Sequence, residues 1–273
     1  MTIVIDGNKL AEQKETELKK KVEALRLKGR VPKLVGLVMK DDEAGLLYCR
    51  LKEEAAERIG VEFEKQVMAE PGVEKIVRLI EKYNQDERVG GIMVQRPGVS
   101  WGKQQGMSRE EFEVWWEKLV EEIDLKKDVD GLRQDSRFTM ATVKAVAKVL
   151  ELEGVVRGKV VVVGSQGLIG RRLIKYLSNK GFEVKGVDVD ETDLSRVTKE
   201  VEVLISATGQ AGLIKAEMVK PGAVVIDVGW PKGDVKFETV KEKASVITPV
   251  PGGIGPLTVV SLLESLLEVG YIT

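Results

Sequence analysis

Histidine is absent from the 273-residue sequence, and cysteine occurs once, as Cys49. Without imidazole the chain has no Ser-His or Cys-His nucleophile pair and no zinc site that needs histidine ligands. A single thiol also excludes an intrachain disulfide and a site with several thiolates. Proton transfer near neutral pH is therefore left to a perturbed lysine or carboxylate, a tyrosine, or water.

Long apolar runs and an excess of one charge are missing too. Stretches such as Val160–Val163 are far shorter than a membrane span, and Asp6 and Lys9 stand where a signal peptide would be apolar. The 43 Lys and Arg residues balance 44 Asp and Glu residues, so no overall field favours nucleic acid or an anionic membrane. We predict a cytoplasmic protein with no bound metal, no membrane and no nucleic-acid partner.

Strand-like and helix-like patterns alternate along the chain, which predicts an α/β fold with parallel sheets. The length fits one large domain or two medium ones. In the first half, strands are predicted at Lys33–Met39, Val61–Val67 and Gly91–Val94, and helices over 43–59 and from Ser108. Pro97–Met107 carries no periodicity and is predicted to be a loop. Asp124–Arg137 is predicted to cross between domains.

Three glycines follow a second-half strand, Lys159–Val163, and open a helix: Gly164, Gly167 and Gly170. A strand, a glycine-rich turn and a helix form the context of a dinucleotide-binding fingerprint, because glycines permit a tight turn and close approach of the backbone to a pyrophosphate. The helix N-terminus then holds the anion. The GxxGxxG spacing also fits an ordinary turn between a strand and a helix.

Asp188 ends the next predicted strand, 18 residues after Gly170. A carboxylate at this place usually binds the ribose hydroxyls of adenosine. Asp190 and Glu191 follow, and such a cluster repels a 2′-phosphate, which favours NAD over NADP. A solvated acidic turn is the alternative.

Tyr48 and Lys52 are four residues apart, so they project from one side of their predicted helix. Surface packing is the common alternative for such a pair. Gln95 stands just after a buried strand, at the end where open α/β sheets bind ligands. Asp130 and Gly131 fit a turn, since Asp-Gly favours one.

Several segments together carry a family resemblance. The most specific is Thr248–Thr258, TPVPGGIGPLT; the others are Lys127–Gly131 (KDVDG), the YxxxK of Tyr48–Lys52, GIMVQ ending at Gln95, and Val224–Gly229 (VVIDVG). The chain resembles the methylene-tetrahydrofolate dehydrogenase/methenyl-tetrahydrofolate cyclohydrolase family from Ile5 to the final helix.

The resemblance implies two lobes with a cleft between them, where substrate and nicotinamide meet. Residues 1–136 and 257–273 are the implied folate-binding, catalytic lobe, and 137–256 the Rossmann-type lobe that binds NAD or NADP. The implied protein is a homodimer of one-carbon metabolism and purine biosynthesis. It oxidises 5,10-methylene-tetrahydrofolate and hydrolyses the methenyl product to 10-formyl-tetrahydrofolate.

Site residues are implied position by position. Lys52 is the acid/base residue, Gln95 its hydrogen-bond partner, Tyr48 the ring that contacts the pterin, and Asp130 the carboxylate that holds the pterin. The other implied substrate-binding residues are Gly131, Ile254, Gly255, Pro256 and Leu257. The implied cofactor-binding residues are Gly164, Ser165, Gln166, Gly167, Gly170, Asp188, Thr208, Gly209 and Trp230.

The implied chemistry suits a chain without histidine. The folate nitrogens assist hydride transfer to nicotinamide, so the protein need only position two rings. Hydrolysis needs a group that manages the proton of water, and a lysine can do so where partial burial favours its neutral form. Gln95 can orient that amine without favouring its protonated form, because a carboxamide carries no charge. Asp130 can accept two hydrogen bonds from N–H groups at the pterin edge.

The chain departs from the family pattern at both implied sites. Gly131 is followed by Leu-Arg-Gln-Asp-Ser rather than His-Pro-x-Asn, and Gln95 by Arg-Pro-Gly-Val rather than Leu-Pro-Leu-Pro. Gly164-Ser-Gln lacks the arginine that suits a 2′-phosphate, and Trp230 replaces an isoleucine. We expect altered folate recognition and a preference for NAD. A dehydrogenase without cyclohydrolase activity and a non-catalytic nucleotide-binding protein are the alternatives.

Overall fold

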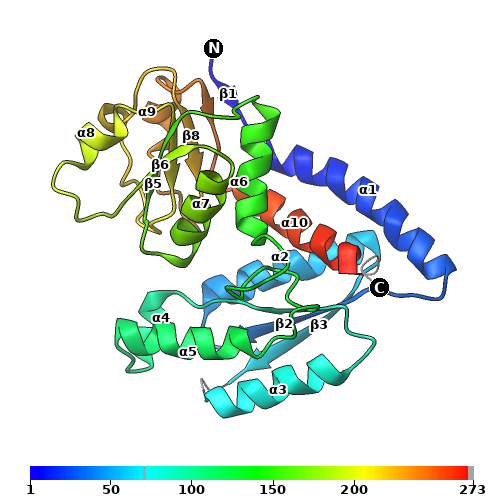
Figure 1. Cartoon of the computed structure of the whole chain (residues 1–273). Coiled ribbons are helices and arrows are strands. Elements are labelled where there is room, and N and C mark those ends of the chain that lie inside the picture. The colour runs from blue at the N-terminus through cyan, green and yellow to red at the C-terminus, as the bar shows by residue number, and fades with distance from the viewer. Residues whose placement is uncertain (70–71, 270–273) are drawn as a thin grey trace. The chain divides into compact units, whose positions relative to one another are not determined.

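The computed structural model describes residues 1–69 and 72–269, which form two compact units (Figure 1). Unit 1 contains residues 1–12 and 142–258, and unit 2 contains 13–141 together with the chain from 259 onward. The lobes predicted from sequence divide the chain at nearby positions, but they place residues 1–12 with the other unit. Each unit is therefore assembled from segments that are far apart in the sequence.

A three-stranded parallel sheet organises the described part of unit 2, in the order β3-β2-β4. The strands are β2 (Lys33–Met39), β3 (Glu62–Met68) and β4 (Gly91–Val94). The helices are α2 (Glu43–Ile59), α3 (Val73–Gln85), α4 (Val99–Gln104), α5 (Arg109–Glu121) and most of α1 (Gly7–Leu27). β2 and β4 are almost wholly buried, as is usual for parallel strands covered by helices.

Local signals in the sequence set the ends of these helices. α2 ends at Gly60, whose φ of 86° is the left-handed conformation that glycine adopts without a steric penalty. At the start of α5, the Ser108 side chain accepts from Glu111 N and the Glu111 side chain accepts from Ser108 N, a capping box that begins the helix predicted from Ser108.

Two predictions about the middle of the chain are wrong. Pro97–Met107 is not a plain loop, because it contains α4; the buried Trp101 packs on Trp115 with ring centroids 5.4 Å apart. Tertiary packing stabilises a helix too short to show periodicity. Asp124–Arg137 does not cross between units either, since the chain remains in unit 2 as far as Ala141.

Unit 1 contains a six-stranded parallel sheet among the described residues, in the order β1-β9-β8-β7-β5-β6. The strands are β1 (Ile3–Val4), β5 (Lys159–Val163), β6 (Glu183–Val187), β7 (Val203–Ser206), β8 (Val224–Asp227) and β9 (Val246–Ile247). The helices are α6 (Ala141–Leu152), α7 (Leu168–Asn179), α8 (Leu194–Thr198), the 3-10 helix η1 (Ala216–Met218) and α9 (Phe237–Lys241). The first residue of α6 belongs to unit 2, and α10 (Ile254–Val269) begins in unit 1 but lies mostly in unit 2.

Each sheet reverses its strand order once. In unit 1 the chain passes from β5 outward to β6 and then returns to β7 on the other side of β5; in unit 2 it passes from β2 to β3 and returns to β4. Ligands of open α/β sheets bind outside the carboxyl ends of the strands at such a point. The fold therefore predicts one site after β5 and β7, and another after β2 and β4.

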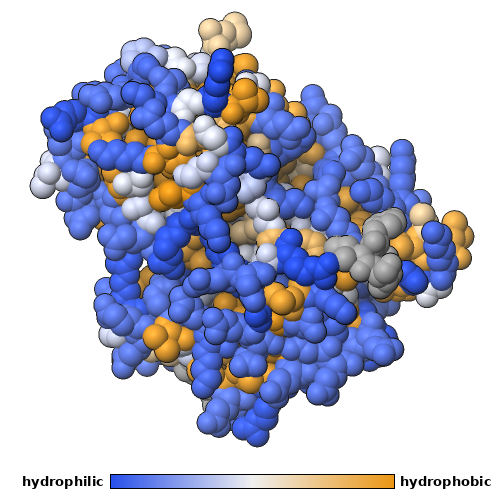
Figure 2. All heavy atoms as spheres, in the orientation of Figure 1, coloured by the Kyte–Doolittle hydropathy of each residue, from blue (hydrophilic) through white to orange (hydrophobic). Residues whose placement is uncertain are grey.

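The surface is largely polar on the face shown in Figure 2, where hydrophobic residues form separate small groups. Among the residues that the structure describes, no helix is both long and apolar enough to span a bilayer.

Candidate active site

Lys52, on α2, lies among polar groups of unit 2. Its Nζ donates to Gln95 Oε1 at 3.3 Å and to Asp130 Oδ2 at 3.4 Å, and lies 4.9 Å from the centroid of the Tyr48 ring. Only 3% of the lysine is exposed. The structure thus brings together the four residues that the sequence suggested as catalytic.

Lys52 occupies the buried face of its helix. Gly45, Cys49, Lys52 and Ala56 follow one another at three- and four-residue steps, and all are buried. A buried ammonium needs polar partners to offset its lost hydration. The Asp130 carboxylate and the Gln95 amide supply them, and the Tyr48 ring adds a cation–π contact.

Asp130 is held by the turn that contains it. The neighbouring Asp128 is fully buried and accepts the backbone N–H groups of Leu132 at 2.9 Å and Arg133 at 3.0 Å. Burial raises the pKa of the Asp128 carboxyl. Gly131 has a φ of 69°, and a Cβ there would lie 2.5 Å from Met140 N. The Asp-Gly turn predicted from sequence is therefore confirmed, with the Asp130 side chain directed at Lys52.

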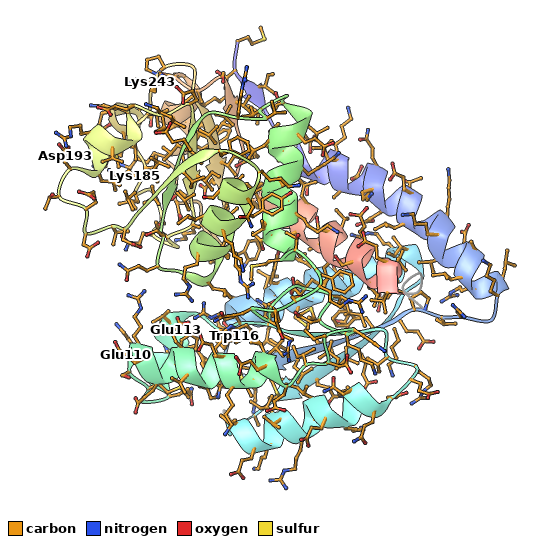
Figure 3. The ribbon with its side chains drawn as sticks, viewed as in Figure 1. Glu110, Glu113, Trp116, Lys185, Asp193 and Lys243 are labelled. Atoms are coloured by element: carbon orange, nitrogen blue, oxygen red, sulfur yellow. The ribbon has the colours of Figure 1, made fainter. Side chains whose placement is uncertain are left out.

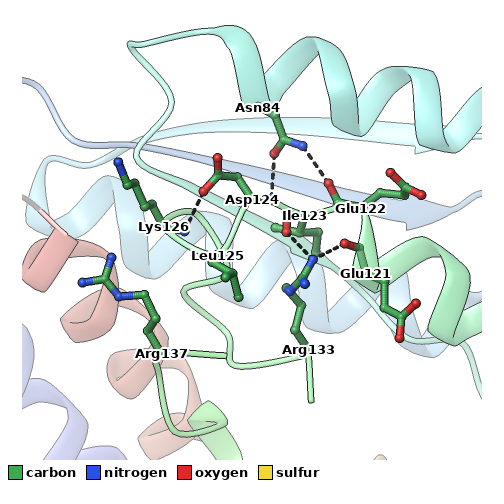
Figure 4. A pocket seen from close by; sticks show the side chains of 9 residues that line it. All are labelled: Asn84, Glu121, Glu122, Ile123, Asp124, Leu125, Lys126, Arg133 and Arg137. Carbon is green, nitrogen blue, oxygen red and sulfur yellow. Dashed lines mark hydrogen bonds between the residues drawn. The ribbon is translucent and has the colours of Figure 1, made fainter. Parts of the chain in front are cut away.

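A surface pocket of about 460 Å³ lies beside the segment that leads into this turn (Figure 4). Asn84 bridges Asp124 N and Glu122 O, at 3.0 and 2.7 Å, and Arg133 donates to the Ile123 carbonyl at 3.0 Å. None of the site residues predicted from sequence lines the pocket. Its hydrogen bonds anchor the chain just before Asp128.

Arg96 follows Gln95 directly, and the sequence analysis assigned it no role. Its Nη2 lies 2.6 Å from Glu113 Oε1, and its guanidinium lies 5.1 Å from the Phe112 ring centroid and 5.5 Å from that of Trp116. Figure 3 shows Glu113 and Trp116 on α5. The pair joins α5 to the exit of β4, but nothing in the sequence shows which acid Arg96 contacts.

The glycine-rich turn of unit 1 has the geometry of a phosphate-binding loop. Gly164 has a φ of 91°, and a Cβ on it would lie 2.5 Å from the Ala207 carbonyl oxygen after β7. A Cβ on Gly170 would lie 2.1 Å from the Gly164 oxygen. Gly167 caps α7 with an extended backbone, which leaves the first N–H groups of a 12-residue helix directed at the turn.

Asp188 directly follows β6 and contacts this turn. Its carboxylate accepts hydrogen bonds from the Ser165 hydroxyl and, at 3.2 Å, from Gln166 N. The acidic residue predicted to contact an adenosine ribose therefore lies directly against the glycine-rich turn.

Two buried acids that sequence reasoning missed hold the loop after β7. Asp234 Oδ2 accepts from Ser206 Oγ at 2.9 Å and from Thr208 N at 2.7 Å. Asp227 accepts the N–H groups of Gly229, Asp234 and Val235 at 2.8, 3.1 and 2.8 Å. Burial raises the pKa of the Asp227 carboxyl to about 6, although these three donors oppose the rise. Asp234 thus holds the backbone of Thr208, and Gly209 follows it with a φ of 67°. Trp230 lies in the loop whose N–H groups Asp227 accepts.

Ile254, Gly255, Pro256 and Leu257, implied to bind the substrate, form the first turn of α10. Ile254 and Leu257 are buried, whereas Gly255 and Pro256 are half-buried. In residues 1–69 and 72–269, no group of acidic or cysteine side chains is arranged to hold a metal ion.

Comparison with known families accounts for both sites. A model described as the catalytic domain of tetrahydrofolate dehydrogenase/cyclohydrolase matches residues 5–130, and one for its NAD(P)-binding domain matches 140–271. The chain belongs to this family. Within the tetrahydrofolate dehydrogenase/cyclohydrolase family, the Lys52 group falls in the catalytic domain and the glycine-rich turn in the NAD(P)-binding domain.

Individual relatives match over nearly their whole length. The bifunctional protein FolD of Exiguobacterium sp. is 37% identical over 98% of this chain and 99% of its own. The structure of the bifunctional enzyme FolD from Campylobacter jejuni has a TM-score of 0.88 and 30% identity, covering 99% of each chain. The Trypanosoma brucei FolD structure, complexed with NADP cofactor and inhibitor, has a TM-score of 0.87 and 29% identity, covering 100% of this chain and 99% of that one.

Proposed function

We propose that this enzyme oxidises 5,10-methylene-tetrahydrofolate to the methenyl form with a nicotinamide dinucleotide, and hydrolyses the methenyl form to 10-formyl-tetrahydrofolate. The observation that carries the proposal is the buried Lys52 amine, 3.3 Å from the Gln95 amide oxygen and 3.4 Å from the Asp130 carboxylate. Family membership and the names of the bifunctional relatives support both activities.

The dinucleotide, when bound, supplies the hydride acceptor for the first step. The residues of unit 1 fit such a group, because the turn of Gly164–Gly170 and the N-terminus of α7 form an anion cradle that side chains at Gly164 or Gly170 would fill. In unit 2, the Asp130 carboxylate and the Tyr48 ring orient the pterin. The protein's contribution to the first step is to position the two rings.

Lys52 manages the proton of the second step. The oxygen of water bonds to the methenyl carbon and loses one proton, which is released overall. The bond from that carbon to N5 then breaks as the C=O bond of the formyl group forms, and the second proton of the water passes to N5. The Lys52 amine is the proton-transfer group next to the reacting carbon. Gln95 has no ionisable group, so it orients the amine without taking the proton, while Asp130 holds both the amine and the pterin edge.

The cofactor is proposed to be NAD rather than NADP. Asp188 places a carboxylate against Ser165 and Gln166, where a 2′-phosphate would meet repulsion. The glycine-rich turn also lacks an arginine in the position after Gly164.

The family resemblance further supports a homodimer in the cytoplasm.

One assay separates the two activities. Purified protein is mixed with tetrahydrofolate and formaldehyde, and reduced nicotinamide is followed with NAD and NADP separately; hydrolysis of isolated methenyl-tetrahydrofolate is then measured without cofactor. Dehydrogenation without hydrolysis would identify a monofunctional dehydrogenase. Absence of both reactions in folded protein that binds dinucleotide would identify a non-catalytic binding protein.

We expect Lys52→Met to abolish hydrolysis of methenyl-tetrahydrofolate, because methionine keeps much of the side-chain volume but has no proton to transfer. Dinucleotide binding, measured by calorimetry, should survive, since the glycine-rich turn belongs to unit 1. Arg50→Met is the matched control, because Arg50 lies on the exposed face of the same helix. Undiminished hydrolysis in the Lys52 variant would place the general base elsewhere.

A further inference from the structure

Asp42 is a buried acid that the proposed mechanism does not use. It immediately precedes α2 and is 8% exposed. Its Oδ2 has no hydrogen-bond partner among residues 1–69 and 72–269. Burial raises the pKa of the Asp42 carboxyl, and the Gly45 backbone N–H opposes the rise only in part. A buried polar atom without a partner destabilises a fold, so its place next to the candidate site calls for an explanation.

Asp42 and Gln95 lie at the same edge of one sheet. β2 and β4 are paired in parallel, with Leu37 opposite Val94, and Asp42 and Gln95 follow the carboxyl ends of these two strands. Gly45 lies between them: a Cβ there would be 2.1 Å from Asp42 Oδ2 and 3.2 Å from Gln95 Cγ. Only a residue without a side chain lets the carboxyl and the glutamine chain approach this point together.

The free hydrogen-bonding groups of the two side chains are complementary. A carboxamide has one acceptor oxygen and two N–H donors. Gln95 Oε1 accepts from Lys52 Nζ at 3.3 Å, while Gln95 Nε2 donates to none of the residues that the structure describes. Asp42 Oδ2 is a buried acceptor that lacks a donor, and Gln95 Nε2 carries two N–H donors.

The amide of Gln95 needs such a partner for a chemical reason. A protonated lysine offers donors alone, so only the oxygen end of the carboxamide can bond to it. Turning the amide over changes the shape of the site hardly at all, but it would present an NH₂ group to the amine and remove the contact. A group that binds Nε2 therefore decides which way the amide points.

We propose that Asp42 is a positioning residue for Lys52: its carboxyl accepts a hydrogen bond from Gln95 Nε2 and so keeps Gln95 Oε1 directed at the lysine amine. A rotation about the terminal bonds of the glutamine side chain forms this bond. The consequence for catalysis rests on the proposed function, whereas the contact between Asp42 and Gln95 does not.

Two independent measurements test the proposal, with Asp42→Ala, Asp42→Asn, Gln95→Ala and the double alanine variant. In hydrolysis of methenyl-tetrahydrofolate, Asp42→Ala should lower kcat about tenfold, a loss of about 1.4 kcal/mol in transition-state stabilisation, with a smaller change in KM. Asp42→Asn should retain most of kcat, because its amide oxygen still accepts from Nε2. In the Gln95→Ala background, Asp42→Ala should have no further effect. Asp41→Ala, at the exposed neighbour, is the control.

Urea unfolding of the same four proteins measures the contact without any activity. The effects of Asp42→Ala and Gln95→Ala on the unfolding midpoint should be less than additive. Additive effects would overturn the proposal, as would a folded Asp42→Asn variant that loses as much kcat as Gln95→Ala. If the unaltered enzyme does not hydrolyse the substrate, the proposed function fails, and the unfolding cycle still decides whether Asp42 holds Gln95.

Discussion

At the scale of single residues, Asp188 accepts hydrogen bonds from two donors that could otherwise bind an anionic ligand. These donors are Ser165 Oγ and Gln166 N, and both are already bonded to the Asp188 carboxylate. We expect Asp188→Ser to raise kcat/KM for NADP relative to NAD about tenfold, equivalent to about 1.4 kcal/mol. The substitution removes the repelling charge and frees the two donors for a 2′-phosphate. Initial rates with each cofactor at fixed folate concentration measure the change.

Glu183→Ser provides the control for this prediction, since Glu183 is an exposed acid at the opposite end of β6. It should leave the cofactor ratio within about twofold, because a screened surface charge contributes little. An unchanged ratio in the Asp188 variant would show that cofactor choice is made by other groups.

The sequence predicts which residues surround Lys52, but it does not predict how deeply Lys52 is buried. The four-residue spacing of Tyr48 and Lys52 correctly places them on one side of a helix, and Gln95 correctly follows a buried strand. The burial of Lys52 could not be predicted, because a search for apolar periodicity assigns a lysine to the solvent face. The role of Asp42 could not be predicted for a related reason. Its Oδ2 atom is buried without a hydrogen-bond partner, and it lies near Gln95 only because β2 and β4 are neighbours in the folded sheet.

At the scale of elements, α5 is expected to hold the exit of β4 through Arg96 and Glu113. The two side chains are 19% and 26% exposed and lie 2.6 Å apart. Removing one partner of a largely buried pair leaves the other charge without compensation. We expect Glu113→Ala to lower the free energy of unfolding by roughly 2 kcal/mol, and Arg96→Ala/Glu113→Ala to cost less than the sum of the single changes. Urea unfolding followed by circular dichroism measures both.

Glu110→Ala tests whether the effect belongs to the pair or to the helix. Glu110 is exposed on α5, in its first turn (Figure 3), so its loss should cost only a few tenths of a kcal/mol. Equal effects at the two positions would contradict a specific role for the contact with Arg96.

The sequence predicts well the elements that carry an apolar run or a helix cap, and it does not predict the elements that lack such a local signal. β2 and β4 have the bounds that their apolar runs predict, and the capping box marks the start of α5. α4 was missed because its six residues span less than two turns, and Trp101 is buried by contacts with α5 that no local pattern shows. The two-residue strands β1 and β9 could not be predicted either, because they are defined by pairing with strands that are distant in the sequence and not by a pattern of their own residues.

At the scale of the molecule, Asp227 links stability to pH. Its folded-state pKa of about 6 exceeds the ordinary 3.8, so the folded chain binds this proton more tightly than the unfolded chain. The resulting stability is fully present below about pH 4 and is lost as the pH rises through 6. Asp227→Asn removes this dependence, so the stability advantage of the unaltered chain should be larger at pH 4.5 than at pH 7.5, by about 2 kcal/mol.

Comparing the two proteins cancels the titration of all other groups, including the buried Asp128. Urea unfolding at several pH values between 4.5 and 7.5 gives the difference directly. The Asn variant should be less stable throughout, because its NH₂ group faces one of the three backbone donors that Asp227 accepts. A difference independent of pH would contradict the raised pKa.

The parallel pairing of β1 with β9 joins Ile3 to Val246 and Val4 to Ile247. During synthesis on the ribosome, β1 emerges long before β9 and stays without this partner while the chain between the two strands is translated. A nascent chain stalled ahead of Val246 therefore lacks the strand that connects β1 to the rest of its sheet. An excised fragment of residues 142–258 meets the converse difficulty, because the open edge of β9 is then exposed to pairing with other molecules.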